Sequence, residues 1–160
     1  MKTDYTVGED KKTLIAKRSF NAPLEKVWHA WTDGEMLEKW WGPKPYDAVT
    51  ESFSFTEGGE WRYIMKGPEG DAHHCINKYL TIDPEKEFTA EDSFTNENWE
   101  VNPEMPTSHW KVEFSHTDGV TYVCVTTTYS SADELETITK MGMKEGFDIG
   151  LNQLEALLSN

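Results

Sequence analysis

The stretch that organises the chain is Asn21-Ala22-Pro23-Leu24-Glu25-Lys26-Val27-Trp28, which follows an alternating apolar run over residues 13–20. A proline near the first helical position fixes a backbone angle that suits helix entry, so a helix is expected to start at Leu24. Apolar residues then recur at i, i+3, i+4 and i+7, on one helix face: Leu24, Val27, Trp28 and Trp31. The sequence therefore predicts a first strand over 13–20, followed directly by an amphipathic helix.

A second short helix is expected after Asp33-Gly34, because Met36, Leu37, Trp40 and Trp41 form a further apolar group that ends at Gly42-Pro43-Lys44-Pro45. The pattern then changes to short alternating runs separated by turn residues, as expected for an antiparallel meander of strands over 48–55, 60–66, 73–82, 88–94, 107–115 and 120–129. The polar segment 96–106 contains Pro103 and Pro106 and is interpreted as a loop.

A long terminal helix is expected to begin at the capping box Ser131-Ala132-Asp133-Glu134. Its apolar stripe consists of Met143, Phe147, Leu151, Leu154 and Leu158, with a possible break at residues 140–142. By the logic of packed layers, this order of elements predicts an α+β fold in which a curved antiparallel sheet wraps around the long C-terminal helix. We expect one domain over residues 1–160, with residues 1–10 as a loose N-terminal tail.

Composition excludes several classes of partner. The chain has 160 residues, 37% of them apolar, including 7 Trp, which is enough to build a core. A net charge of −14 disfavours nucleic acid and anionic membrane surfaces, and no apolar run approaches the ~20 residues of a membrane helix. The charged N-terminus is unlike a signal peptide, so a soluble, cytoplasmic protein is expected. Cys75 and Cys124 form no CxxC pair, which argues against a disulfide framework or zinc knuckle.

Four motifs, in this order along nearly the whole chain, resemble the family named for the activator of the Hsp90 ATPase: residues 21–28, Lys39-Trp40-Trp41-Gly42-Pro43, Ile82-Asp83-Pro84-Glu85-Lys86-Glu87-Phe88, and Glu145-Gly146-Phe147 with Leu151 and Leu154. That family belongs to the helix-grip, START-like (SRPBCC) superfamily, which also includes lipid-transfer domains, the birch-pollen allergen proteins and polyketide cyclases. The chain departs from the pattern at Phe147, where many relatives carry Trp, and at Asn77, where they tend to carry Gly. The resemblance implies a deep apolar cavity between the sheet and the long helix.

The candidate cavity residues come from five parts of the chain. Strand alternation places Trp61, Tyr63 and Met65 on one face, and it places Cys75, Asn77 and Tyr79 together on the next strand. Each of these side chains can equally be ordinary core. Trp40 is interpreted as packing the short helices, whereas Trp41, about 100° further round the helix, can reach the cavity mouth. The full candidate set is Trp41, Trp61, Tyr63, Met65, Cys75, Asn77, Tyr79, Trp110, Met143, Gly146, Phe147 and Gly150.

Three glycines recur every fourth residue in the terminal helix, at Gly142, Gly146 and Gly150. Each glycine lowers helix propensity by about 1 kcal/mol relative to alanine. Two explanations stay open. The glycines either allow close backbone packing or a helix break, or they leave room for a ligand beside Trp61, Tyr63 and Met65.

No metal or cofactor is predicted. His73 and His74 point to opposite faces of one strand, and no HExxH motif, phosphate-binding glycine loop or GxSxG motif is present. We therefore predict no catalytic residues, and the sequence leaves enzyme activity undecided while favouring a binding protein. Three functions remain: a module that encloses a small apolar or aromatic ligand, a module that binds the Hsp90 chaperone, and a cyclase-like or hydrolase-like enzyme that uses the same cavity.

Overall fold

The computed structural model describes residues 2–159. Its strands are β1 (Asp4–Val7), β2 (Thr13–Phe20), β3 (Asp47–Phe53), β4 (Glu60–Lys66), β5 (Ala72–Asp83), β6 (Glu87–Thr95), β7 (Ser108–Thr117) and β8 (Val120–Thr128). Its helices are α1 (Leu24–Thr32), α2 (Gly34–Trp40), α3 (Ala132–Lys140) and α4 (Met143–Leu158). Among these residues no helix is both long enough and apolar enough to cross a membrane.

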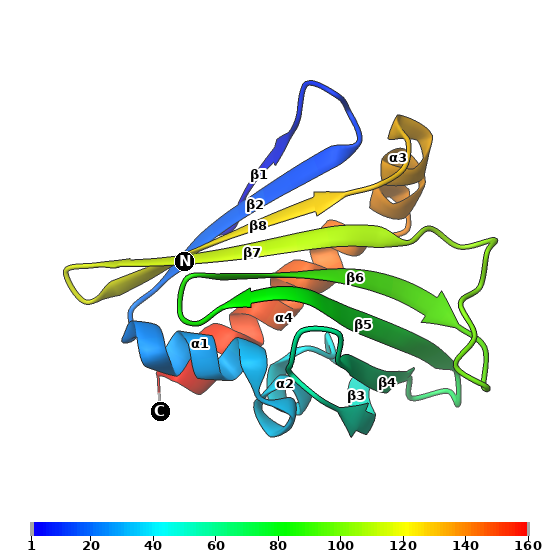
Figure 1. Cartoon of the computed structure of the whole chain (residues 1–160), viewed down its shortest axis with the longest axis horizontal. Helices are drawn as coiled ribbons and strands as arrows, with labels where there is room; N and C mark the ends of the chain where they lie inside the picture. Colours follow the sequence, from blue (N-terminus) through cyan, green and yellow to red (C-terminus); the bar gives the residue numbers. More distant parts are fainter. Residues whose placement is uncertain (1, 160) are drawn as a thin grey trace.

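The strands form one antiparallel sheet in the order β1-β2-β8-β7-β6-β5-β4-β3. The sheet curves, and α4 runs across its concave side while α1 and α2 lie at one end (Figure 1). This is the predicted α+β helix-grip fold, and the predicted strands and short helices agree with the observed bounds to within a residue or two.

The expectation of a loose tail over residues 1–10 is wrong for the part of it that the structure describes. Asp4–Val7 forms β1, which pairs with β2 from Asp4 opposite Lys17 to Val7 opposite Leu14. The Tyr5 hydroxyl also donates a hydrogen bond to Asp148 Oδ1 of α4, at 2.8 Å. A four-residue strand has too little apolar alternation to be recognised from its own sequence, and β1 is identified only by its pairing with β2.

The terminal helix is divided in two at Gly142, whose φ of 92° lies in the left-handed region that favours glycine. The Ser131 side chain accepts a hydrogen bond from the Glu134 N–H, as the capping motif predicts. The Glu134 carboxylate accepts in turn from the Ser130 N–H, one residue before the position that a standard capping box would use. Because of this break, α3 and α4 can adopt different directions above the sheet.

The core fills the space between the sheet and the helices. Trp40, Trp61, Phe20, Leu154 and Val27 are among its fully buried side chains. The indole N–H of Trp40 donates to the Ala30 carbonyl at 2.8 Å, which joins the end of α2 to α1. Trp40 therefore packs the short helices as predicted.

Candidate functional site

A cavity of about 390 Å³ lies between the sheet and the α3–α4 region. One wall comes from the helices and from the segment that follows α2, and the other comes from the concave face of the sheet. The residues that line it are Trp40, Trp41, Pro43, Tyr46, Tyr63, Met65, His73, Cys75, Asp92, Phe94, Pro106, Ser108, Trp110, Tyr129, Ile138, Met141, Gly142, Met143, Gly146, Phe147 and Gly150. Most of this lining is apolar or aromatic, as is typical of small-molecule pockets.

The two glycines of α4 that line the cavity differ in their surroundings. A Cβ atom at Gly146 would meet only Pro43 Cγ, at 3.8 Å, so the space beside this residue is open. A Cβ atom at Gly150 would lie 3.3 Å from the Trp40 carbonyl oxygen, which is a tight backbone approach. Gly146 therefore borders open space, whereas Gly150 allows α4 to pack closely on the end of α2.

A hydrogen-bonded clamp holds that close packing in place. The Gln153 amide of α4 donates to the carbonyl oxygens of Trp40 and Gly42, both at 2.9 Å, and its oxygen accepts from the Lys44 N–H at 3.1 Å. The segment that presents Trp41 to the cavity is thereby fixed to α4. Local order of this kind is what a binding wall needs if it is to exist before the ligand arrives.

Trp41 and Trp110 separate the large cavity from a second, much smaller space. Their ring centroids lie 5.8 Å apart, and each ring also contacts Phe147, at 6.4 Å and 5.7 Å respectively. The Trp41 indole donates to the Tyr63 hydroxyl at 3.0 Å. Behind the two tryptophans is a void of about 20 Å³, with room for about one water molecule.

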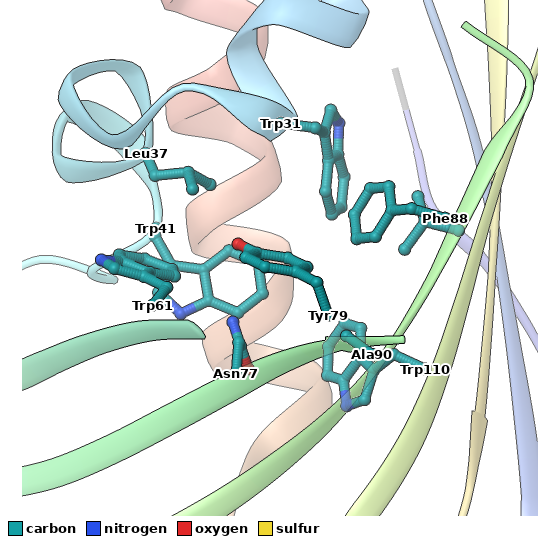
Figure 2. A pocket seen from close by; sticks show the side chains of 10 residues that line it. Trp31, Leu37, Trp41, Trp61, Asn77, Tyr79, Phe88, Ala90 and Trp110 are labelled. Atoms are coloured by element: carbon teal, nitrogen blue, oxygen red, sulfur yellow. The ribbon is translucent and has the colours of Figure 1, made fainter. Parts of the chain in front are cut away.

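The structure divides the twelve predicted residues between these two spaces. Nine line the large cavity: Trp41, Tyr63, Met65, Cys75, Trp110, Met143, Gly146, Phe147 and Gly150. The other three, Trp61, Asn77 and Tyr79, line the inner void, and Figure 2 shows their side chains grouped there with Trp41 and Trp110. Strand alternation grouped Trp61 with Tyr63 and Met65, and it grouped Asn77 and Tyr79 with Cys75, but it could not show that two tryptophans divide the space above these strands.

Sequence reasoning missed Asp92, the one carboxylate among the described residues that line the cavity. Asp92 follows Phe88 and Ala90 and precedes Phe94 at alternate positions of β6, on the concave face of the sheet. Its Oδ1 atom is buried and has no hydrogen-bond partner among the described residues. The signal was available, because an acidic residue interrupts an otherwise apolar stripe with a period of two.

Burial raises the pKa of Asp92 to about 7, since a carboxylate that has lost its water is less stable than the neutral acid. The pKa values of the neighbouring thiol and phenol groups are raised as well. Burial, followed by the charge of Asp92, raises the pKa of Cys75 and of Tyr129 to about 12. The pKa values of Tyr63 and Tyr79 are also raised, chiefly by burial. The thiol and the three phenols therefore stay protonated at neutral pH.

The remaining lining residues that were not predicted come mostly from chain segments outside regular strands. Tyr46 follows α2, Pro106 precedes β7, and Tyr129 follows β8. Ile138 and Met141 reach the cavity because the terminal helix breaks at Gly142. Across residues 2–159, no group of three or more His, Cys, Asp or Glu side chains is arranged to hold a metal ion.

Comparison with known proteins identifies relatives of this architecture. The family model described as "Activator of Hsp90 ATPase homolog 1-like protein" matches residues 21–159. Protein Ms6760 from Mycobacterium smegmatis is 32% identical with a TM-score of 0.89, over 98% of this chain and 96% of that one. A protein from Arthrobacter aurescens is 28% identical with a TM-score of 0.90, over 99% and 91%. No curated protein matches the sequence. Since the family model spans nearly the whole chain, the chain belongs to the Activator of Hsp90 ATPase homolog 1-like family.

Proposed function

We propose that this protein binds a small apolar or aromatic ligand in the cavity between the sheet and α4. The main support for the proposal is the open space beside Gly146, the fourth residue of the 16-residue helix α4. A glycine within a helix lowers its stability by up to about 1 kcal/mol relative to alanine. No backbone of another element lies close enough to require it, so a ligand that occupies the space explains the residue better than packing does.

The dimensions and chemistry of the cavity support this proposal. Its volume of about 390 Å³ falls in the range of about 300–1,000 Å³ that is usual for small-molecule sites. Trp41, Trp110 and Phe147 offer aromatic surface at one end. Apolar walls of this kind fix the size of a ligand more strongly than its identity.

Binding without covalent chemistry is favoured by the state of the potential nucleophile. A thiol reacts as its thiolate, and the raised pKa of Cys75 holds it protonated. The three tyrosines near Asp92 are neutral for the same physical reason. The cavity therefore supports a receptor or carrier better than a hydrolase.

Titration with N-phenyl-1-naphthylamine, an uncharged probe whose fluorescence rises in apolar surroundings, tests the proposal. We expect saturable binding with one site per chain. Native mass spectrometry of protein purified without added ligand is the companion measurement, and we expect it to show a bound small molecule that unfolding releases. The proposal fails if the probe does not bind in a saturable manner to protein that shows no co-purified molecule.

The family description names an activator of the Hsp90 ATPase, which gives a second candidate function, interaction with an Hsp90-type chaperone. With a net charge of −14, such an interaction would use a basic patch on the partner and would weaken as salt screens the charges. A pull-down with the chaperone at low and high salt tests this function. Enrichment no greater than that of an unrelated protein of similar charge would exclude it.

A further inference from the structure

The cavity contains a carboxylate that an entirely apolar ligand would leave without a partner. Resting on the proposed cavity function, we infer that Asp92 anchors a cationic amine, so that the ligand is an ammonium group carried on an aromatic or aliphatic body. The inference comes from three features of the structure: a carboxylate in the cavity lining with one unpaired buried oxygen, the absence of a facing cation among the described lining residues, and an aromatic lining of the same cavity.

The first feature is the position of the carboxylate. Asp92 lines the cavity and is partly exposed, while its Oδ1 atom is buried without a hydrogen-bond partner. Leaving a buried acceptor unpaired costs about 1–3 kcal/mol, and more when the group is charged. An ionised Asp92 would therefore be stabilised by any ligand that brings a hydrogen-bond donor with a positive charge.

The second feature is that the surrounding groups are neutral. On the flanking strands, Asn77 and Ser108 lie opposite Asp92 in register. Tyr63, Cys75, Tyr79 and Tyr129 are near enough for the charge of Asp92 to act on them, and all four are held protonated. From the helical side, the lining residues of α4 are Met143, Gly146, Phe147 and Gly150, and those of the α3 end are Ile138, Met141 and Gly142.

Among the described lining residues, only His73 could bring a positive charge from the protein itself. Its Nε2 atom lies 3.6 Å from Asp71 Oδ2, and its side chain is 55% exposed, so the imidazole is directed to Asp71 and to solvent. The counterion for Asp92 is therefore left for a ligand to supply.

The third feature is the aromatic lining. Trp41, Trp110 and Phe147 form a mutually packed group in the wall of the same cavity, and Tyr63 and Phe94 also line it. Aromatic faces attract ammonium groups, and they do so more strongly where water is excluded. The net charge of −14 favours the approach of cations over anions. A carboxylate beside aromatic rings thus selects an amine over an acid of the same size.

Three probes of one shape test the inference: 1-naphthylmethylamine, 1-naphthalenemethanol and 1-naphthoic acid, titrated calorimetrically at pH 8. We expect the amine to bind at least 10-fold more tightly than the alcohol, and the acid to bind most weakly. In the Asp92→Asn variant, which keeps the shape of the side chain, the amine should fall to the affinity of the alcohol, and the alcohol should change less than threefold. Glu91→Gln is the matched control, because Glu91 is exposed at the neighbouring position of β6 and its substitution changes the net charge by the same amount.

A pH series on the unmodified protein gives an independent measurement, should the variant not fold. Asp92 is mostly protonated at pH 5.5 and mostly ionised at pH 8, because its pKa is about 7. Affinity for the amine should therefore fall by up to about 30-fold at the lower pH, while affinity for the alcohol stays constant.

The possible outcomes separate this inference from the proposed function. Equal affinities for all three probes, unchanged by Asp92→Asn, would overturn the amine anchor and leave the apolar cavity standing. Equal weakening of the amine and the alcohol in Asp92→Asn would also overturn it, because the carboxyl group would then only shape the cavity. Failure of every probe to bind, including N-phenyl-1-naphthylamine, would remove the cavity function and the anchor together.

Discussion

Replacing Gly146 by leucine should close the cavity without unfolding the protein. The new Cβ would meet only Pro43 Cγ, at 3.8 Å, so the side chain can enter the open space without displacing backbone. Leucine places three further carbon atoms beyond Cβ. If this side chain excludes from the cavity a part of the probe equivalent to three methylene groups, the binding free energy weakens by about 2.4 kcal/mol, at about 0.8 kcal/mol for each methylene. This change corresponds to roughly a 50-fold increase in Kd.

The assay is fluorescence titration with N-phenyl-1-naphthylamine, alongside thermal unfolding followed by circular dichroism. Gly146→Ala is the matched control. It adds the Cβ alone and should gain up to about 1 kcal/mol of helix stability while binding the probe normally. If folded Gly146→Leu binds the probe with an affinity within threefold of that of the unmodified protein, the cavity does not extend beside residue 146. If Gly146→Leu unfolds although Gly146→Ala is stable, the space beside residue 146 is not open.

Three further predictions concern stability. Gly150→Leu should destabilise the fold by about 1–3 kcal/mol in urea unfolding, because its Cβ would lie 3.3 Å from the Trp40 carbonyl oxygen; unchanged stability would show that the contact can relax. Asp92→Asn should stabilise the protein at pH 8 by a few kcal/mol more than at pH 4, at about 1.4 kcal/mol per unit of pKa shift. The pKa of Asp92 in the folded protein, about 7, lies above the usual 3.8, so between these pH values the native state binds a proton that the unfolded state does not. The contribution of Asp92 to stability therefore falls as pH rises, and equal effects of the substitution at both pH values would contradict this. Arg18→Ala should cost about 1–3 kcal/mol, because the buried guanidinium joins β2 to Asn152 at 2.8 Å and Glu155 at 3.3 Å on α4, while the 38% exposed Glu155 side chain can be rehydrated once Arg18 is removed. A loss below about 1 kcal/mol would argue against that role.

Most of the fold could be predicted because its signals are local. Pro23 marks the start of α1, the apolar alternation defines β2 and the meander, and Ser131 caps α3. β1 could not be predicted, because four residues carry too little pattern and its stability depends on pairing with β2 and on the contact of Tyr5 with Asp148. Short edge strands of this kind are defined by their partners rather than by their own sequence.

The candidate site was predicted less completely, for a different physical reason. Alternation shows which side chains share a face, and it placed Tyr63 and Met65 correctly toward the helix. It does not show where large side chains divide the enclosed space, so the separation of Trp61 from the cavity by Trp41 and Trp110 was not predictable. Asp92 was predictable in principle, as an acidic residue in an apolar stripe.

Entry of a small apolar or aromatic ligand into the cavity between the sheet and α4 can be observed at the cavity wall itself. The measurement is a ¹H–¹⁵N NMR titration of the indole N–H signals with N-phenyl-1-naphthylamine. Trp41 and Trp110 line the cavity, whereas Trp99 packs against His74 and Arg62, away from it. We predict saturable shifts of the Trp41 and Trp110 signals with Trp99 unchanged. A probe that shifts the Trp99 signal and leaves the Trp41 and Trp110 signals unchanged would contradict binding in this cavity.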